Sequence, residues 1–350
     1  MNNMESVVEK TKYSSAQEFV NSVLSEGEKY TCDDLSEDFR NRDDLPPFYD
    51  EELFRRGQKF FHKHIFGLFL SKCLGLVAVL AVPSILKVLM FTRMSGTELT
   101  AYKRYVSTIL HMMVWYDSDF KPGSKLWKSI ADVRKRHNSA SNRSCSAGMN
   151  RITQKDMAIT QFGFMGISVC RSKMVGIHKA SDEEWEGFIH IWRVIGYLMG
   201  IEDRFNLCSG TVEETRERCN ILMEQVFRPN IEQKDENFIK MARNMIHALK
   251  CINIFIKFET IMYYLHILSQ DENNNMKLQS TCYKLNSSQK SNLNFLITIM
   301  YMLSWNWFRI FQNYCHMLVL WLMKVFPLLP AYQFGLSNAR VRILSNNKTN

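Results

Sequence analysis

Residues 132–144, DVRKRHNSASNRS, place a single histidine, His137, among four positive charges. The charges belong to Arg134, Lys135, Arg136 and Arg143. An imidazole can ligate a metal ion, and guanidinium and ammonium groups can hold an anion. The segment could therefore bind an anionic group that contains a metal. The alternative is an ordinary histidine on a solvated basic surface.

Apolar residues repeat at helical spacing just before this segment and predict a helix over 124–137: Leu126, Trp127, Ile130 and Val133. Arg134 and His137 then lie one turn apart, with His137 at the end of the helix. The small residues 139–141 that follow would let a flat ligand approach closely. Both features favour a binding site over a surface histidine.

A second candidate stripe lies in the segment 98–116, ELTAYKRYVSTILHMMVWY. On a helix, Arg104, Thr108 and His111 fall on one face, which would carry a fixed cation, a hydroxyl and an imidazole. The same stripe is also typical of the solvated face of an ordinary amphipathic helix. Both interpretations stay open from these residues alone.

The segment 156–208 contains the third candidate group. Ser181 and Glu184 form a capping box that predicts the start of a long helix. The wide apolar face of this helix includes Trp192, and glycines near its end permit close approach of another helix or of a ligand. His190 flanks that face, either as a hydrogen-bonded core histidine or as part of a site.

Periodic apolar stretches of helical length surround these candidates, over 65–91, 97–116, 124–137, 181–203, 211–228, 235–268 and 290–325. Strand signals are few, and 15 Gly and 7 Pro are too few for the turns of an all-β fold. The sequence therefore predicts an all-α fold with a single large helical domain. We expect a polar N-terminal arm over 1–45, the ligand-binding domain over 46–268, a polar loop over 269–292, and C-terminal apolar helices and tail over 293–350.

Net charge narrows the choice of partner. The chain carries a net charge of +9, but its basic residues are scattered and no nucleic-acid motif accompanies them, so we expect no nucleic-acid partner. A net positive charge equally suits an anionic membrane surface or an acidic cofactor.

The cysteines bear on the cellular location. Nine cysteines without a C-x-x-C pair favour a reducing compartment, and no signal-peptide core is visible, so we expect an intracellular protein. The oligomeric state is not defined by the sequence.

Two apolar runs raise the question of a membrane. The run 73–86 lies between Lys72 and Lys87, and its helix would reach about 21 Å, short of a hydrocarbon core of about 30 Å. A buried core helix is the favoured interpretation there. The runs 293–308 and 310–323 are rich in Trp and are split by Arg309. They suit core packing and a membrane interface equally.

Four motifs occur in a fixed order: Arg104 with Thr108, Arg134 with His137, the aromatic segment QFGF at 161–164, and the helix SDEEWEGFIHIWRVIGYLMGI at 181–201. Together they resemble the family that joins the fungal membrane-bound oxygenase of mycophenolic acid synthesis to the bacterial latex-clearing rubber oxygenases. The resemblance covers roughly 55–230. Each motif is loose, but their order and spacing make the resemblance specific.

Members of this family with demonstrated chemistry bind haem b in an all-α, globin-related fold, and the resemblance implies that fold and cofactor here. It implies that His137 is the ligand of the haem iron and that Arg104 and Thr108 are catalytic residues facing the haem. A haem pocket also needs cations for the propionates and an aromatic wall. The cofactor-binding residues expected on this basis are His137, Arg104, Arg134, Arg143, Phe164 and Trp192.

One departure from the family bears on function. Ser107 stands where the rubber oxygenases have a lysine that can occupy the distal iron position, so here that position is open, holds water, or is filled by another residue such as His111 or His190. The family's proposed catalytic acid has no clear equivalent, and Glu98 is the nearest in sequence.

The resemblance implies a haem-dependent oxygenase that uses O2 on a hydrophobic, isoprenoid-like substrate, with association to the endoplasmic reticulum membrane. The alternative is a non-catalytic haem- or lipid-binding protein on the same fold, because fold alone does not fix chemistry.

Overall fold

The computed structural model of the chain describes residues 13–33, 45–254, 256–270 and 283–344. Within these ranges the regular structure is helical, and the only strand-like pairing is an isolated bridge between Thr31 and Thr153. The predicted all-α fold with a single domain is confirmed. A relation to the globins stays a prediction.

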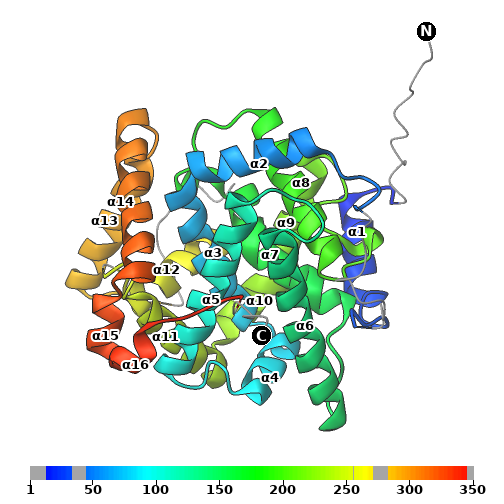
Figure 1. The fold of residues 1–350 in the computed structure, drawn as a ribbon, viewed down its shortest axis with the longest axis horizontal. Helices are drawn as coiled ribbons and strands as arrows, with labels where there is room; N and C mark the ends of the chain where they lie inside the picture. The colour runs from blue at the N-terminus through cyan, green and yellow to red at the C-terminus, as the bar shows by residue number, and fades with distance from the viewer. Residues whose placement is uncertain (1–12, 34–44, 255, 271–282, 345–350) are drawn as a thin grey trace, which may run out of the picture.

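The α-helices, shown in Figure 1, are α1 (Ala16–Ser25), α2 (Glu51–Lys63), α3 (Ile65–Leu80), α4 (Pro83–Thr92), α5 (Glu98–Asp117), α6 (Lys125–Ser146), α7 (Gln154–Cys170), α8 (Asp182–Leu198), α9 (Val212–Leu222), α10 (Arg228–Gln233), α11 (Glu236–Leu249), α12 (Phe258–Ser269), α13 (Ser287–Met302), α14 (Asn306–Val325), α15 (Leu328–Phe334) and α16 (Leu336–Ala339). Short turns add η2 (Ser172–Val175), η3 (Asp203–Phe205) and the π-helical η4 (Met223–Phe227).

Two helix pairs touch backbone to backbone in the body of the domain. Where α2 meets α8, a Cβ atom on Gly57 would lie 2.2 Å from the carbonyl oxygen of Gly187. Where α3 meets α7, a Cβ atom on Gly75 would lie 2.2 Å from the carbonyl oxygen of Gly163. No side chain fits at that distance, so glycine is what allows both contacts.

The apolar run 73–86 is buried within the protein itself. It forms the end of α3 and the start of α4, and the chain bends between them at Ala81 and Val82. Pro83 opens α4, where its missing N–H costs no hydrogen bond. The interpretation of this run as a core segment is confirmed, and the predicted helix over 65–91 is in fact two helices.

Helix α1 belongs to the folded domain although it lies in the expected N-terminal arm. Ser15 caps it, and Phe19, Val20 and Val23 are fully buried where α1 packs on α9. The expected loop over 269–292 lies largely in residues 271–282, outside the described residues.

The prediction that His137 ends its helix is wrong. Helix α6 continues to Ser146, so the small polar run after His137 is helical. Two serines on this run pack by hydrogen bonds instead of apolar bulk: Ser141 Oγ accepts from the Ile152 N–H at 3.0 Å, and Ser144 Oγ donates to the Asn150 carbonyl at 3.0 Å. Apolar periodicity cannot detect a helix that packs in this way.

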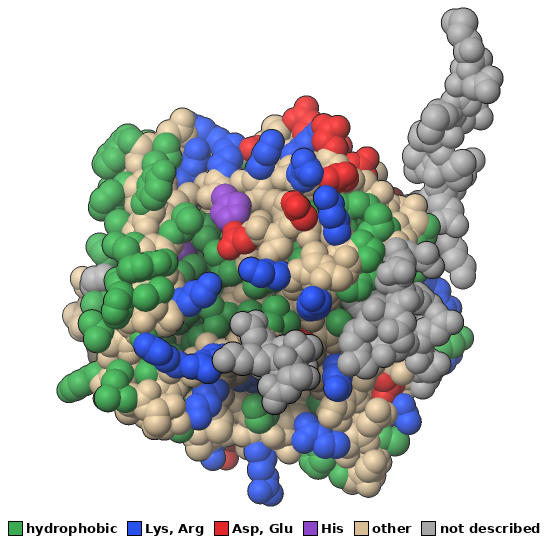
Figure 2. All heavy atoms as spheres, viewed as in Figure 1, with side chains coloured by type: hydrophobic (Ala, Val, Ile, Leu, Met, Phe, Trp, Pro, Cys, Tyr) green, Lys and Arg blue, Asp and Glu red, His purple; other side chains and the backbone are tan. Residues whose placement is uncertain are grey.

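Helices α13, α14 and α15 form a layer along one side of the molecule, drawn in orange to red at the left of Figure 1. Figure 2 shows hydrophobic side chains over that side. Among the described residues no single helix is long and apolar enough to cross a membrane. Two bent pairs reach the length and composition together, α2 with α3 at 92° and α14 with α15 at 55°.

Candidate functional site

A cavity of about 810 Å³ is lined by α5, α6, α7, α8 and the C-terminal segment. Pockets for cofactors and other small ligands have volumes of about 300–1,000 Å³. The basic residues of its lining are Lys103, Arg104, Lys135, Arg136, Arg143, Arg340 and Arg342. Among the lining residues that the structure describes, Asp132 is the only acidic one. The cavity therefore suits a ligand that carries acidic groups.

His137 reaches this cavity from the middle of α6 and is half-buried. Its Nδ1 atom is buried and has no hydrogen-bond partner. Burial, and then the nearby Arg104 guanidinium, lower the pKa of His137 to about 4. The imidazole is therefore neutral at pH 7, with an unpaired ring nitrogen, which is the form that ligates metals.

Arg104 and Thr108 approach the same cavity from α5. Arg104 Nη1 donates to Ser95 Oγ at 3.5 Å, and no carboxylate pairs with this guanidinium in the described part of the chain. Burial lowers the pKa of Arg104, but arginine stays charged in proteins. Thr108 Oγ1 donates to the Arg104 carbonyl at 3.1 Å, which leaves the hydroxyl oxygen able to accept another hydrogen bond.

Phe164 and Trp192 form an aromatic wall of the cavity. Their ring centroids lie 5.4 Å apart with an interplanar angle of 22°. Gln161 fixes α7 against α8 beside this wall, because its Nε2 donates to the Trp192 carbonyl at 2.8 Å and its Oε1 accepts from the Leu207 N–H at 3.0 Å. Gly196 leaves room for this amide, since a Cβ atom there would lie 2.5 Å from Gln161 Nε2.

His111 lines the cavity next to Asp132. Its Nδ1 lies 2.7 Å from Ser129 Oγ, which also accepts from Trp115 Nε1 at 2.9 Å. Its Nε2 lies 3.4 Å from Asp132 Oδ2, an electrostatic contact without the alignment of a hydrogen bond. The carboxylate favours the tautomer with the hydrogen on Nε2, in which Nδ1 accepts from the Ser129 hydroxyl. Burial, opposed by Asp132, lowers the pKa of His111 to about 4.

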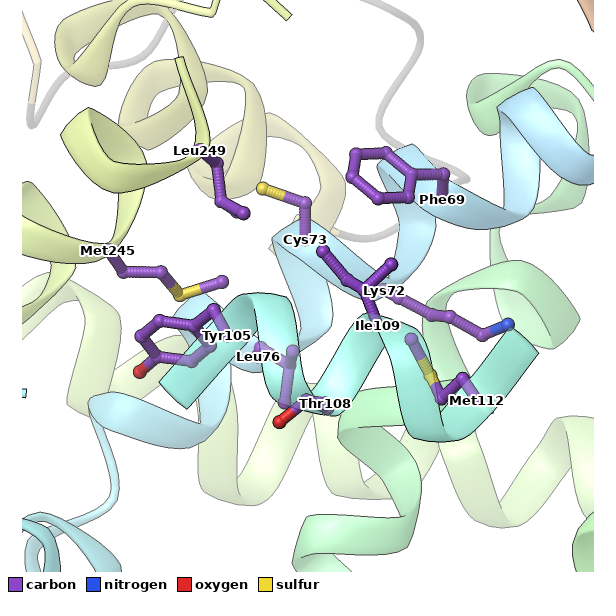
Figure 3. A pocket seen from close by; sticks show the side chains of 10 residues that line it. All are labelled: Phe69, Lys72, Cys73, Leu76, Tyr105, Thr108, Ile109, Met112, Met245 and Leu249. Carbon is purple, nitrogen blue, oxygen red and sulfur yellow. The ribbon is translucent and has the colours of Figure 1, made fainter. Parts of the chain in front are cut away.

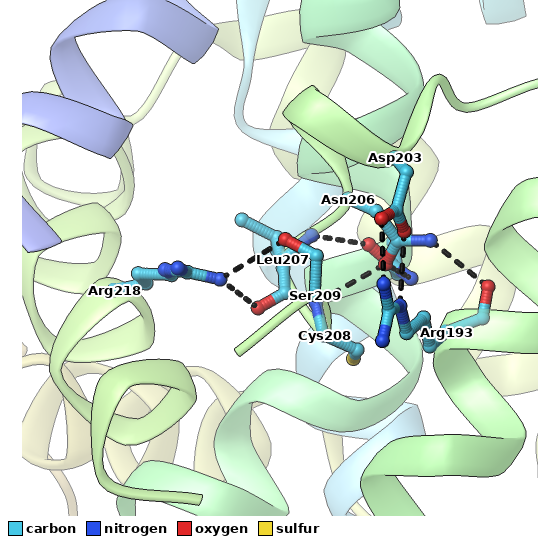
Figure 4. Close-up of polar contacts among 8 residues, drawn as sticks. Arg193, Asp203, Asn206, Leu207, Cys208, Ser209 and Arg218 are labelled. Atoms are coloured by element: carbon cyan, nitrogen blue, oxygen red, sulfur yellow. Dashed lines mark hydrogen bonds and ion pairs between the residues drawn. The ribbon is translucent and has the colours of Figure 1, made fainter. Parts of the chain in front are cut away.

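The chain after α8 is fixed by two arginines (Figure 4). Arg193 donates through Nε and Nη2 to the two carboxylate oxygens of Asp203 at 2.9 and 2.6 Å. Arg218 Nη1 donates to the Leu207 carbonyl at 3.2 Å, and Asn206 Nδ2 donates to the Arg193 carbonyl at 2.9 Å. These contacts explain the arginine at position 193 of the motif 181–201 as a structural residue, because they hold α8 and its aromatic wall in place.

Five of the six residues expected to bind the cofactor lie together on this one cavity: His137, Arg104, Arg143, Phe164 and Trp192. The sixth, Arg134, is not among the lining residues. It is buried, and its Nη1 donates to the Leu198 carbonyl at 3.2 Å, at the end of α8.

His190 and Glu98 also lie outside the lining. His190 Nε2 accepts from the Asp50 backbone N–H at 3.0 Å, which joins α8 to the start of α2. Glu98 lies 2.9 Å from Nδ1 of His247, a partner on α11. Of the two histidines left open for the distal side, His111 is therefore the one that reaches the cavity.

Sequence reasoning missed the C-terminal part of the lining. The segment after α16 crosses in front of α5 in Figure 1 and brings Arg340 and Arg342 to the cavity. It is anchored on α5, because the Tyr102 hydroxyl donates to the Ala339 carbonyl and Lys103 Nζ donates to Asn338 Oδ1 at 2.7 Å. A contact across more than two hundred residues leaves no local signal in the sequence.

A second, much smaller cavity of about 20 Å³ adjoins the site at Thr108, between α3, α5 and α11 (Figure 3). Of its described lining residues, Lys72 is the only lysine, arginine or carboxylate, and its Nζ lies 4.4 Å from the ring centroid of Phe61 and 4.6 Å from that of Tyr116. Burial lowers the pKa of Lys72 well below its ordinary value. The volume is that of one water molecule, so this space cannot hold the cofactor.

A half-buried, neutral imidazole thus lines a basic, aromatic-walled cavity of an all-α domain. The chain belongs to the family described as ER-bound oxygenase mpaB/B'/Rubber oxygenase, catalytic domain, whose model matches residues 61–253, more than half of the sequence. The expected family is thereby confirmed, and the domain is of an oxygenase class. Comparison with curated proteins and with solved structures finds no match.

Proposed function

We propose that this protein is a haem b-dependent oxygenase that uses O2 on a hydrophobic substrate, with His137 as the ligand of the iron. The observation that carries the proposal is the unpaired Nδ1 of His137 in a basic cavity of cofactor size. When bound, haem would supply the activation of O2, while the protein supplies ligation, orientation and electrostatics.

The residues on the cavity fit haem by their chemistry. Haem has two carboxylate groups, and Arg104, on α5, has a guanidinium without a carboxylate partner among the described residues. Arg143 on α6 and Arg340 on the C-terminal segment add cations from two further directions. The stacked rings of Phe164 and Trp192 offer a flat apolar wall to a flat ring system.

His111 is our candidate for a group that holds a proton at the cavity. The Asp132 carboxylate beside Nε2 favours the tautomer with the hydrogen on that nitrogen, and Nδ1 lies 2.7 Å from Ser129 Oγ. Ser107 also lines the cavity but is too short to act as the family's distal lysine does. We therefore assign His111 a positioning role in proton delivery and not a role as a resident iron ligand.

The substrate is proposed to be a lipid-soluble molecule. Besides its basic and polar residues, the cavity lining contains a set of apolar side chains: Met94, Val133, Met157, Ile195, Met199 and Ile201. The family description includes the words ER-bound, which supports a location at that membrane. A hydrophobic substrate dissolved in a bilayer would be available there.

A non-catalytic haem- or lipid-binding protein is the second candidate. The observation that favours it is the absence of a free carboxylate on the described cavity lining, since Asp132 is paired with Arg136 at 2.9 Å. Uptake of O2 by the reduced protein, with and without a polyisoprenoid, separates the two candidates. Only the enzyme consumes O2 in proportion to a new oxygenated product.

The ligand assignment is tested by the absorption spectrum of protein expressed with a haem supply. We expect a Soret band in the unmodified protein and its loss in His137→Ala. His62→Ala is the matched control, because His62 is a half-exposed histidine on α2 that does not line the cavity. A His137→Ala protein that purifies with a full Soret band would refute the assignment.

A further inference from the structure

The outward face of α14 is apolar from Trp307 to Leu322, between the exposed Asn306 and Lys324. Trp307, Phe311 and Tyr314 are 64%, 58% and 70% exposed. Neighbouring helices continue the same surface, which we call the apolar face. Its exposed members are Phe295, Tyr301, Trp305, Trp307, Ile310, Phe311, Tyr314, Met317, Leu318, Trp321, Leu322, Phe326, Leu328, Leu329, Tyr332 and Leu336. Figure 2 shows this surface along the left side of the molecule.

The inward face of α14 is polar up to His316 and apolar only near its end, at Leu320 and Met323, whereas a surface helix in water turns an apolar face inward along its length. Arg309, Asn313 and His316 are buried against α2 and α3. Asn313 Nδ2 donates to the Lys63 carbonyl at 2.9 Å, and Asn313 Oδ1 accepts from the Phe66 N–H at 3.3 Å, at the break between α2 and α3. The polar side of α14 therefore packs inside the protein, and its apolar side has no partner in the described chain.

Such an extended apolar surface is not what a monomer in water presents. The largest apolar patch of an ordinary soluble monomer covers about 300–600 Å². The apolar face spans four helices, α13 to α16, and contains three tryptophans and three tyrosines, the residue types that concentrate where a bilayer meets water. Leucine, isoleucine and phenylalanine fill the space between them, as in proteins that lie in one leaflet.

The charge of the C-terminal region indicates which kind of partner covers the apolar face. Residues 273–350 contain no Asp or Glu and eight Lys or Arg. Lys290 and Lys324 are exposed on α13 and α14, next to the apolar face. A second copy of this chain would bring like charges together across such an interface, whereas anionic lipid headgroups would complement them.

We infer that the apolar face docks the protein onto one leaflet of an anionic bilayer, without spanning it. The inference rests on the proposed function only in placing the protein at a membrane. The apolar face and part of the cavity lining belong to one stretch of chain, because α15 and α16 are followed by Arg340 and Arg342.

Vesicle flotation tests the docking with the full-length chain. The expected result is that the protein floats with phosphatidylcholine–phosphatidylserine vesicles and less with phosphatidylcholine alone. A triple variant on the apolar face should lower partitioning at least about tenfold: Trp307→Gln, Phe311→Gln and Leu318→Gln. A matched triple variant at exposed apolar residues elsewhere should float as the unmodified protein does: Leu45→Gln, Met90→Gln and Ile254→Gln.

Tryptophan fluorescence of the unmodified protein gives an independent measurement that needs no variant. Trp305, Trp307 and Trp321 are exposed, so adding anionic vesicles should shift their emission to shorter wavelength. The inference is overturned if the protein neither floats nor shifts, if the apolar-face variant floats normally, or if the face proves to be covered by a second copy in a dimer that does not float.

Failure of this inference and failure of the haem assignment are distinguishable. His137→Ala should lose the Soret band and still float. A coloured protein that stays at the bottom of the gradient would reject the docking face and keep the haem assignment. A colourless protein that floats would do the opposite.

Discussion

His111 Nδ1 lies 2.7 Å from Ser129 Oγ, inside the packed contact between α5 and α6. Trp115 Nε1 donates to the same oxygen at 2.9 Å, and Asp132 Oδ2 lies 3.4 Å from the other ring nitrogen of His111. The carboxylate favours the hydrogen on Nε2, so Nδ1 accepts from the Ser129 hydroxyl. A hydrogen bond to one ring nitrogen commonly orients a histidine and sets its tautomer.

Replacement of His111 should reduce turnover without removing the cofactor. In His111→Gln we expect the Soret band to stay and the oxygenation rate to fall by about 10²-fold, within the range for loss of a proton-transfer group. The two measurements are the absorbance per protein and the product formed per minute. Loss of the Soret band together with the activity would mean that His111 supports haem binding and not proton delivery.

Ser129→Ala should give a milder form of the same defect. It leaves the His111 ring in place but removes the hydrogen bond to its Nδ1, and it leaves the buried Trp115 N–H without an acceptor, at a cost of about 1–3 kcal/mol in stability. The pH–rate profile should change shape, which a purely structural role would not cause. Ser146→Ala is the matched control, because Ser146 is an exposed residue on the same helix that does not line the cavity. An unchanged profile would remove Ser129 from the proton path.

Substitution of Arg104 and of Arg134 should distinguish an arginine that binds the cofactor from one that stabilises the fold. Arg104 faces the cavity without a carboxylate partner among the described residues, so Arg104→Leu should lower the haem retained after gel filtration. Arg134 instead donates to the end of α8, so Arg134→Leu should lower the melting temperature while folded protein keeps its haem. The reverse result would restore Arg134 as a propionate ligand.

The contact between α3 and α7 should tolerate no side chain at Gly75. A methyl group there would meet the Gly163 carbonyl oxygen at 2.2 Å, so Gly75→Ala forces the helices apart and should cost at least about 1–3 kcal/mol of unfolding free energy. Gly96→Ala serves as the control, because its nearest neighbour, the Arg93 carbonyl, would lie 3.9 Å away. Urea denaturation of both variants measures the difference. Equal stability would show that the helix pair can relax.

Much of the site could be predicted because its residues repeat on regular helices. Arg104 and Thr108 share a face of α5 by spacing alone, and Phe164 and Trp192 were placed by motifs whose order is specific. The role of Gln161 was not predicted, since a buried amide that joins two helices has the same local pattern as an exposed one.

Other features depend on packing that no local pattern encodes. Arg134 lies one turn from His137 in sequence, yet its side chain reaches the Leu198 carbonyl and not the cavity. Arg340 and Arg342 follow an unremarkable segment, and only the anchoring of α16 on α5 brings them to the site. The division of the chain at 45/46, 268/269 and 292/293 stays a prediction.

Buried neutral histidines should make the protein sensitive to mild acid, and His190 offers the sharpest test. Burial, opposed by Asp50 and assisted by Arg193, lowers its pKa to about 4 from an ordinary value near 6.5. Because the folded state holds His190 neutral, its contribution to stability is fully present above pH 6.5 and is lost as the pH falls towards 4. Between pH 7 and pH 5 the loss of unfolding free energy is roughly 2 kcal/mol for this residue.

The variant His190→Gln keeps an acceptor for the Asp50 N–H but cannot titrate, so its unfolding free energy should fall less over that interval. His62 has the opposite sign, since its hydrogen bond to Asp117 raises its pKa, and His62→Gln should not flatten the acid dependence. Equal pH slopes in His190→Gln and the unmodified protein would show that His190 takes up a proton in the folded state.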